Sequence, residues 1–241
     1  MNKKIGVLGG GQLGKMLLQE VTKFDLEIWF MDTTFDSPVG SIYPYFVQGD
    51  FRKYEDVMAF GSGMDILTVE IENVNTKALA ELESAGVVVR PQSRVLDIIK
   101  DKGIQKQFYL EHGIPSSDFF LVEGRKEIVS KIASGILTLP FVQKARTAGY
   151  DGKGVKVIKT KDELEDILDV PSVIESVVAI EKELAIIVGC NSKKQKTFFP
   201  VTEMVFNKEG HLLDYLQCPA DISESTIKRC IEIAELSLIH I

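Results

Sequence analysis

Two glycine-rich segments of the chain contain residue types that bind phosphate groups. The first, at positions 9–14, reads GGGQLG and matches the pattern GxGxxG through Gly9, Gly11 and Gly14. It lies between an apolar run and an amphipathic segment, which predicts a strand, a tight turn and a helix whose N-terminal amides can bind an anion. Asp32 lies 18 positions after Gly14, at the end of the next expected strand, where a carboxylate can accept from the ribose hydroxyls of a dinucleotide. These residues leave three interpretations open: an NAD-dependent dehydrogenase, a site for another phosphorylated ligand, and a plain strand-to-helix turn.

The second segment, at positions 144–155, is more specific. It reads KARTAGYDGKGV, with three glycines within six residues and two lysines, Lys144 and Lys153. The amides of such a loop can surround phosphate oxygens, and the lysines add positive charge. Because it joins two expected strands, it is neither a Walker loop nor a Rossmann turn. An exposed hairpin is the alternative, but this much conformational freedom costs folding entropy, so we interpret the segment as a lid over a ligand.

Composition and charge exclude several classes of function. The 241 residues carry a net charge of −7 with no long block of one sign, so we expect no nucleic-acid partner. The sequence has no run of about 18 apolar residues, so we expect no membrane span. The cysteines Cys190, Cys218 and Cys230 are odd in number and far apart, which favours reduced core thiols in a cytoplasmic protein over disulfides or a metal site.

The first hundred residues alternate short apolar runs with amphipathic segments. This pattern is typical of a doubly wound parallel sheet, because parallel strands need helical crossovers on both faces. We expect strands over 4–8, 27–31, near 46, over 65–69 and over 87–89, and helices over 12–24, 54–60 and 76–84. The first helix is expected to pack through one apolar face made of Leu13, Met16, Leu17, Val21 and Phe24.

The pattern changes near Arg90–Pro91, and the later elements are shorter and more mixed. We expect helices over 95–99, 101–111, 161–168 and 222–235, and strands over 119–122, 141–144, 155–158, 173–175, 185–188, 197–206 and 211–215. The last three strands indicate an antiparallel sheet. We therefore divide the chain into domains over 1–100, 101–173 and 174–241.

Several short motifs occur together along the chain: GQLG at 11–14, TVEIENV at 68–74, DK at 101–102, QK at 105–106, the lid, and Glu175 with Glu183. With this combination the chain resembles the ATP-grasp superfamily, and most closely its N5-carboxyaminoimidazole ribonucleotide synthetases, from Ile5 to about Ala234. The resemblance implies an α/β fold, in which a Rossmann-like, pre-ATP-grasp parallel-sheet domain precedes an ATP-grasp domain that is incomplete at its C-terminus.

The resemblance implies an ATP site between two small sheets. Two lysines would neutralise the phosphates, the lid would close over them, the segment 175–178 would contact adenine, and Glu183 would accept from the ribose hydroxyls. The residues implied for ATP are Lys102, Lys144, Gly149, Tyr150, Asp151, Gly152, Lys153, Gly154, Val155, Glu175, Ser176, Val177, Val178 and Glu183. Without the family, Lys102 would be interpreted as a solvated helix lysine and the two glutamates as surface carboxylates.

The N-terminal domain is implied to bind 5-aminoimidazole ribonucleotide, with its phosphate and ribose at the first glycine turn. The residues implied for this substrate are Gly11, Gln12, Leu13, Glu70, Tyr150 and Lys153. Glu70 and Glu72 alternate with Ile71, so on a strand they would share one face, where a substrate amine or a salt bridge would balance their charge. The family more often has Arg at the position of Lys153, and Lys keeps the charge but loses the bidentate fork.

The activity implied is the ATP- and bicarbonate-dependent carboxylation of 5-aminoimidazole ribonucleotide to its N5-carboxy derivative, in purine biosynthesis. Bicarbonate would take the terminal phosphoryl group of ATP to give carboxyphosphate, which would carboxylate the substrate amine in a site closed to water. The family uses Mg²⁺ and commonly forms homodimers, and no catalytic side-chain nucleophile is needed. A formate-dependent glycinamide ribonucleotide transformylase is the alternative within the superfamily, and an NAD-dependent dehydrogenase is the alternative outside it.

The end of the chain departs from the family pattern. The carboxylates that hold magnesium in the family are expected beyond Ile241, and Phe206 stands where the family often has His. Residues 236–241 resemble a translated sequencing adapter. We therefore expect a fragment that is native to about Glu235 and inactive by itself.

Overall fold

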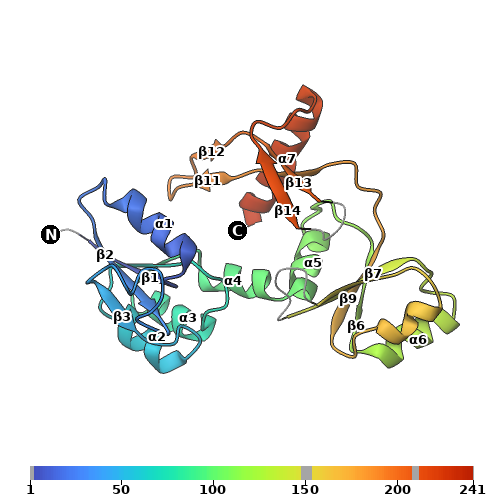
Figure 1. Cartoon of the computed structure of the whole chain (residues 1–241), viewed down its shortest axis with the longest axis horizontal. Coiled ribbons are helices and arrows are strands. Elements are labelled where there is room, and N and C mark those ends of the chain that lie inside the picture. The colour runs from blue at the N-terminus through green and yellow to red at the C-terminus, as the bar shows by residue number, and fades with distance from the viewer. Residues whose placement is uncertain (1–2, 148–153, 208–211, 241) are drawn as a thin grey trace. The chain divides into compact units, whose positions relative to one another are not determined.

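The computed structural model describes residues 3–147, 154–207 and 212–240 (Figure 1). By its internal contacts the chain divides into two compact units, Met1–Ile104 and Gln105–Ile241, which we call the N-terminal unit and the C-terminal unit. None of the described helices is both long enough and apolar enough to cross a membrane.

The N-terminal unit is built on a five-stranded parallel sheet, as the alternating sequence pattern predicts. The strand order is β3-β2-β1-β4-β5, and every neighbouring pair is parallel. The strands are β1 (Lys4–Leu8), β2 (Glu27–Asp32), β3 (Phe46–Gln48), β4 (Ile66–Val69) and β5 (Val88–Arg90). The helices are α1 (Gln12–Val21), α2 (Tyr54–Gly61), α3 (Thr76–Ser84) and α4 (Ser93–Lys100). The strand order reverses between β1 and β4, which makes their carboxyl ends the expected ligand site.

Both faces of this sheet are buried, because successive residues of a strand point to opposite faces. In β1, Val7 and Leu8 are both fully buried. Leu8 belongs to the core that α2 and α3 cover, and Val7 belongs to the core that α1 covers. Figure 1 shows α1 on one side of the sheet and α2 and α3 on the other. Burial on both faces explains why these strand sequences are continuous apolar runs.

Helix α1 packs through a different face from the one that its apolar spacing predicts. Its buried residues are Gly14 and Leu18, and Val21 packs against the same core. The other predicted core residues, Leu13, Met16, Leu17 and Phe24, are exposed. The prediction was wrong because α1 approaches the backbone closely: a Cβ on Gly14 would lie 3.2 Å from the Gly9 carbonyl oxygen. The face that carries the glycine therefore meets the sheet.

The C-terminal unit contains a four-stranded antiparallel sheet in the order β6-β9-β7-β8. Its strands are β6 (Phe119–Val122), β7 (Phe141–Ala145), β8 (Val155–Ile158) and β9 (Ser172–Ser176). Helix α5 (Lys102–Glu111) precedes them in the chain, and α6 (Arg125–Ala133), which was not predicted, packs on the core of this sheet through Ile128. The helix expected over 161–168 is a short 3-10 turn, Asp162–Asp166.

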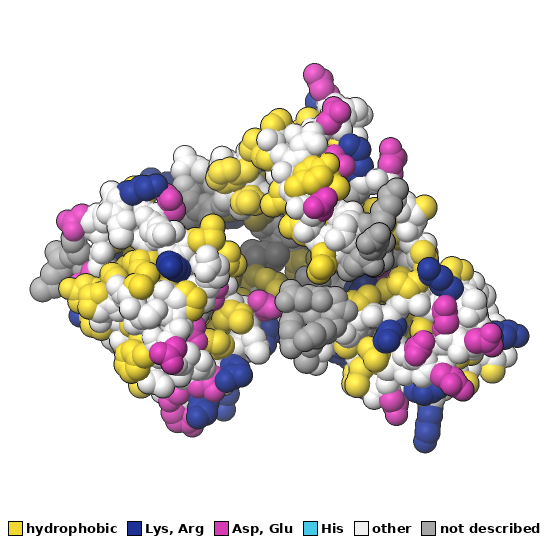
Figure 2. All heavy atoms as spheres, viewed as in Figure 1, with side chains coloured by type: hydrophobic (Ala, Val, Ile, Leu, Met, Phe, Trp, Pro, Cys, Tyr) yellow, Lys and Arg dark blue, Asp and Glu magenta, His cyan; other side chains and the backbone are white. Residues whose placement is uncertain are grey.

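A second group of strands follows in the same unit. β10 (Glu183–Ala185), β13 (Thr202–Phe206) and β14 (Leu213–Gln217) form one antiparallel sheet, β11 (Val188–Cys190) pairs with β12 (Lys196–Phe198), and α7 (Glu224–His240) follows. The expected strands over 185–188 and 197–206 are each divided. The second break lies between Phe198 and Thr202 and contains Pro200. Proline has no N–H for a hydrogen bond to a neighbouring strand, so it interrupts the ladder. The side chains of Leu213, Tyr215 and Leu216 are exposed in this region. Figure 2 shows hydrophobic side chains at the surface over this group of strands.

The cysteines do not lie in a core, contrary to the expectation from their sequence context. Cys190 and Cys218 are exposed and Cys230 is half-buried, and all three are free thiols. Cys190 ends β11 in a two-stranded ladder, and Cys218 directly follows β14. These strands have no second packed face at the cysteine positions, so an apolar residue type does not imply burial there.

Truncation of Leu18 tests which face of α1 packs on the sheet. Leu18→Ala is expected to lower the free energy of unfolding by about 2–4 kcal/mol, because it leaves a cavity in the core. Leu17→Ala, the matched control on the exposed face, should change it by less than about 1 kcal/mol. Urea unfolding followed by circular dichroism gives both values, and a larger loss for Leu17→Ala would mean that the face predicted from the sequence is the packed one.

Candidate functional site

The first glycine segment forms the turn between β1 and α1, at the carboxyl edge of the parallel sheet. Gly9 has a φ of +109°, a left-handed value that favours glycine. A Cβ on Gly9 would overlap the Glu70 carboxylate, and a Cβ on Gly11 would lie 3.3 Å from the same carboxylate. The strand, turn and helix predicted here are confirmed, and the glycines let the backbone pass close to Glu70.

Glu70 directly follows β4 and lies at the start of α1. The backbone amides of Gly14 and Leu13 face its carboxylate and favour its charged form, so a negative charge already lies at this helix N-terminus. Burial raises the pKa of Glu70 above its usual value, the Asp32 carboxylate raises it further, and the two amides compensate only in part. Glu70 is therefore a carboxyl group that retains a proton to a higher pH than an ordinary glutamate.

Glu70 and Glu72 do not share a strand face. β4 ends at Val69, Glu70 is half-buried and Glu72 is exposed. The segment turns here, because the Val74 N–H donates to the carbonyl oxygen of Glu72 at 2.8 Å. The expectation was wrong because alternation over three residues is too short to distinguish a strand from an irregular segment.

Asp32 ends β2 beside the glycine turn, where the sequence predicts it. One of its carboxylate oxygens accepts from the Gly10 N–H (2.7 Å) and the other accepts from the Thr33 N–H (2.6 Å). Both oxygens therefore have backbone partners, which gives Asp32 a structural role in holding the turn against the sheet.

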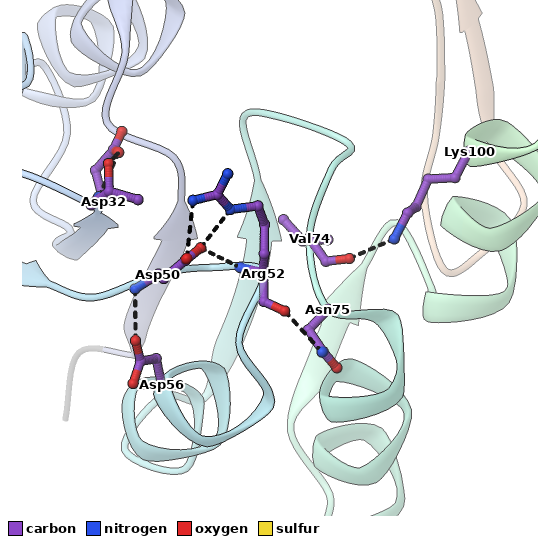
Figure 3. Close-up of polar contacts among 8 residues, drawn as sticks. Asp32, Asp50, Arg52, Asp56, Val74, Asn75 and Lys100 are labelled. Atoms are coloured by element: carbon purple, nitrogen blue, oxygen red, sulfur yellow. Dashed lines mark hydrogen bonds and ion pairs between the residues drawn. The ribbon is translucent and has the colours of Figure 1, made fainter. Parts of the chain in front are cut away.

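Polar contacts join the loops that follow β3 and β4 (Figure 3). The Arg52 guanidinium donates to both carboxylate oxygens of Asp50 (2.7 and 3.0 Å), and Asn75 Nδ2 donates to the Arg52 carbonyl oxygen (3.0 Å). The Lys100 ammonium of α4 donates to the Val74 carbonyl oxygen (2.7 Å). These contacts order the carboxyl edge of the sheet. They also hold Arg52 there as an exposed cation that the sequence motifs did not identify.

In the C-terminal unit, Glu175 lies between two lysines. Its Oε2 accepts from the Lys144 ammonium at 3.0 Å, and its Oε1 lies 3.2 Å from the Lys106 ammonium. The Ser117 hydroxyl also donates to Oε2 at 3.1 Å. Lys144 and Glu175 come from the paired strands β7 and β9, and Lys106 comes from α5. The structure thus brings together two of the residues that the family resemblance implies for ATP.

These three charged groups differ in their exposure to solvent. The side chains of Glu175 and Lys106 are each 11% exposed, whereas that of Lys144 is 34% exposed. Burial alone would raise the pKa of Glu175, but the hydrogen bond and charge of Lys144, with those of Lys106, hold it below its usual value. Glu175 therefore stays negative, and two lysines against one glutamate leave one net positive charge. Lys144 is the member of this cluster most open to an incoming phosphate group.

The lid segment is described only at its two ends. Lys144 lies in β7 before it, and Gly154 and Val155 lead into β8 after it. The predicted ligand residues Gly149, Tyr150, Asp151, Gly152 and Lys153 lie outside the described residues. Their roles stay predictions.

The remaining residues implied for ATP lie on separate elements. Lys102 begins α5 and is half-buried, and Glu183 begins β10 with an exposed side chain. Ser176 ends β9, and Val177 and Val178 follow it with exposed side chains. An exposed apolar pair directly after the strand that carries Glu175 is available to a planar ligand, but no ligand contact is established for these residues.

Within the described ranges, no group of three or more His, Cys, Asp or Glu side chains is arranged to hold a metal ion. Both carboxylate oxygens of Glu175 lie against ammonium groups, a donor set that does not suit Mg²⁺. The side chains around Glu175 therefore do not form a magnesium site in the part of the chain that the structure describes.

Comparison with known proteins assigns both units. Residues 1–100 match the ribonucleotide synthetase preATP-grasp domain, and residues 107–239, more than half of the chain, match the ATP-grasp domain. The chain belongs to the ATP-grasp family. This membership confirms the fold class that the motifs imply, in which a preATP-grasp parallel-sheet domain precedes an ATP-grasp domain.

Relatives of this ATP-grasp protein bear out the resemblance to the N5-carboxyaminoimidazole ribonucleotide synthetases. It is 32% identical over 236 residues to a phosphoribosylaminoimidazole carboxylase of Vigna aconitifolia, covering 95% of this chain and 41% of that protein. The crystal structure of N5-carboxyaminoimidazole ribonucleotide synthetase from Thermotoga maritima is similar with a TM-score of 0.85 and 33% identity, covering 98% of this chain and 61% of the other. An Aspergillus clavatus synthase in complex with ADP and 5-aminoimidazole ribonucleotide has a TM-score of 0.85 and 25% identity, covering 99% and 62%. The chain thus spans about two fifths of the first relative and three fifths of the two solved chains.

Lys106 is the charged residue of the Glu175 cluster that sequence reasoning missed. It belongs to the QK motif at 105–106, to which the sequence assigns no separate role. Its spacing from Lys102 could have identified it. The two lysines are four residues apart on an expected helix, so they lie on one face and could act in the same site. What the sequence could not show is that Glu175, 69 positions later in the chain, pairs with Lys106.

Glu70→Gln tests the cost of placing a charge at the glycine turn. Because folding raises the pKa of Glu70, the native state binds this proton more tightly than the unfolded chain, and stability falls as the pH rises through this pKa. Removal of the charge is therefore expected to raise the free energy of unfolding at pH 7 by about 0.5 kcal/mol, a small gain because solvent screens a half-buried group. The gain should disappear toward pH 4, where wild-type Glu70 is itself protonated.

Glu72→Gln is the matched control, because Glu72 is exposed in the same segment. It should change the stability at pH 7 by less than Glu70→Gln does, because the charge of Glu72 is the smallest of the influences on Glu70. Denaturant unfolding at pH 7 and pH 4 measures both variants, and a loss of stability in Glu70→Gln at pH 7 would contradict the direction of the pKa shift.

Proposed function

We propose that this ATP-grasp protein carries the ribonucleotide-binding and ATP-binding parts of an enzyme that carboxylates 5-aminoimidazole ribonucleotide with ATP and bicarbonate. The observation that carries the proposal is the cluster of Lys144, Glu175 and Lys106 beside the lid segment, in a chain that joins a preATP-grasp to an ATP-grasp domain. The Aspergillus clavatus relative, which holds ADP and 5-aminoimidazole ribonucleotide, supports the same two ligands. The product would be the N5-carboxy derivative, an intermediate of purine biosynthesis.

The ATP site of the proposal belongs to the C-terminal unit. Lys144 lies on β7 directly before the lid segment, so its ammonium is available to the phosphate groups that the lid would cover. In the same unit, the segment 175–178 would contact adenine, and Glu183 would accept from the ribose hydroxyls. A role for Lys102, which belongs to the N-terminal unit, stays a prediction of the family resemblance. Charge neutralisation and positioning supply most of the rate in phosphoryl transfer, so these residues need no nucleophile among them.

The ribonucleotide site of the proposal belongs to the N-terminal unit, with Gly11, Gln12 and Leu13 at its turn. Glu70 is half-buried at the carboxyl end of β4 and has no lysine or arginine among its hydrogen-bond donors in the described residues. The exocyclic amine of the substrate would supply a donor to this carboxylate. Because Glu70 already faces the amides of α1, the substrate phosphate would need other donors. The roles of Tyr150 and Lys153 stay predictions of the family resemblance.

The proposed chemistry starts from bicarbonate, which is a poor electrophile. Transfer of the terminal phosphoryl group of ATP to a bicarbonate oxygen gives carboxyphosphate and ADP. The substrate amine then forms a bond to the carboxyl carbon, or to carbon dioxide released from it, and phosphate leaves. A closed lid would exclude the water that hydrolyses carboxyphosphate. Mg²⁺, a homodimer and a cytoplasmic location complete the proposal.

Two other functions remain as alternatives. A formate-dependent glycinamide ribonucleotide transformylase would use the same kind of ATP site, with formate in place of bicarbonate. The names of the relatives favour carboxylation over this alternative. A dehydrogenase is disfavoured because the N-terminal unit matches a preATP-grasp domain and both Asp32 oxygens have backbone partners.

Ligand titration separates these functions. The chain is expected to bind ATP saturably, to bind 5-aminoimidazole ribonucleotide more tightly than glycinamide ribonucleotide, and not to bind NADH, as measured by isothermal titration calorimetry. In a form of the protein that spans the full length of its relatives, phosphate release should require both the aminoimidazole substrate and bicarbonate. Saturable binding of NADH without ATP would overturn the proposal, and phosphate release with glycinamide ribonucleotide and formate would establish the transformylase.

Lys144→Ala tests the assignment of the ATP site. Loss of the ammonium is expected to weaken ATP binding about tenfold or more, because a charge-assisted contact to phosphate is removed. Binding of the ribonucleotide, which is assigned to the other unit, should not change. Lys126→Ala is the control, because Lys126 is an exposed lysine on α6 of the same unit. Unchanged ATP affinity in Lys144→Ala would count against the assignment.

A further inference from the structure

Lys106 is a buried lysine whose donors all have acceptors. Its side chain is 11% exposed, and its ammonium donates to the hydroxyl groups of Ser116 and Ser117 and lies 3.2 Å from Glu175 Oε1. The ammonium also lies 5.7 Å from the centre of the Phe119 ring, within the range of a cation–π contact. An ammonium held by this many partners has a fixed position. It has no donor left for a ligand.

Lys106 and Lys144 share one partner, Glu175. Through this partner Lys106 affects the charge available at Lys144. Glu175 binds Lys106 through one carboxylate oxygen and Lys144 through the other. Without Lys106, Glu175 would have Lys144 as its single cationic partner among the described residues, and this pair would have no net charge. An incoming phosphate group would then compete with a whole carboxylate for the Lys144 ammonium. The attraction would weaken most in a partly buried site, where solvent screens charges poorly.

We propose that Lys106 is a positioning residue for ATP, which neutralises Glu175 so that Lys144 keeps its positive charge and its direction toward the phosphate groups. This inference rests on the proposed function, because it needs ATP to bind beside Lys144. Lys106 acts on the nucleotide through Glu175. It is therefore distinct from the residues implied to contact ATP.

A purely structural role is the competing explanation. Lys106 connects α5 to the segment that carries Ser116 and Ser117 and to β9, so its loss could lower stability without any effect on ATP. The two explanations differ in one measurable respect. A structural role makes the effect of Lys106 on ATP affinity independent of the charge of Glu175, whereas the proposed role requires that charge.

A double-mutant cycle on the chain measures this dependence. Lys106→Met is expected to weaken ATP binding about tenfold, because it removes the charge that balances Glu175. Glu175→Gln keeps the backbone and the side-chain shape and is the reference background, whatever its own ATP affinity. In the double variant Lys106→Met/Glu175→Gln, no carboxylate competes for Lys144, so adding Lys106→Met to Glu175→Gln should cost little or no further affinity. Calorimetry gives the affinities, and thermal unfolding of each variant reports its stability separately.

Lys131→Met is the matched control. Lys131 also pairs with a glutamate, Glu127, at 3.4 Å, and it also lies over a phenylalanine ring, that of Phe120, at 5.5 Å. It has this environment on α6, so the same substitution removes the same kinds of contact outside the proposed site. Lys131→Met should leave ATP affinity unchanged.

The possible outcomes separate the inference from the function on which it rests. If the wild-type chain does not bind ATP, the proposed function fails, and the inference fails with it. If the wild type binds ATP and Lys106→Met binds it equally well, or if the loss is the same in the Glu175→Gln background, the inference alone is overturned. If Lys106→Met does not fold, the comparison of the double variant with Glu175→Gln decides, because the inference requires these two to bind ATP alike.

Discussion

A carboxylate withdrawn from water needs cations or amide N–H groups around it, and this constraint organises both units of the chain. At the glycine turn, the Glu70 carboxylate faces the backbone amides of Leu13 and Gly14. In the antiparallel sheet, Glu175 takes two ammonium groups. Glu70 directly follows β4, and Glu175 is the last residue but one of β9. The positions of these strands therefore determine where amides or ammonium groups must lie to balance the negative charge.

The two solutions have opposite effects on the carboxyl groups. Burial and the neighbouring Asp32 leave Glu70 with a raised pKa, which the amides of Gly14 and Leu13 offset only in part, whereas two lysines leave Glu175 with a lowered pKa. The folded state therefore favours the protonated form of Glu70 and the ionised form of Glu175. Stability linked to Glu70 falls as the pH rises through its pKa, and stability linked to Glu175 is lost as the pH falls through its folded pKa. At neutral pH the ion pairs of Glu175 are therefore retained, whereas burial of the Glu70 carboxylate at the glycine turn is unfavourable.

Sequence predicted local elements better than the contacts between them. Helix α3 has the predicted bounds, Thr76–Ser84, because the Asn75 side chain caps it by accepting from the Ala78 N–H, and such a cap is visible in the sequence. The packed face of α1 was not predictable in the same way. Its most apolar stripe stays exposed, and the close approach at Gly14 selects the other face. Similarly, the lysine at position 106 was visible, but its pairing with Glu175 depends on how β9 lies against α5.

An acidic chain can bind anionic ligands only through local excess of positive charge, and the described parts of the two units differ in how they provide it. The helix N-terminus at the glycine turn, which by itself attracts phosphate, faces the chain's own Glu70. A phosphate there would have to displace a carboxylate that is already partly destabilised by burial. The cluster around Glu175 has one more cation than anion, and the partly exposed Lys144 carries that excess. The net charge of −7 therefore says little about ligand preference, because single buried partners decide which lysine or amide is available.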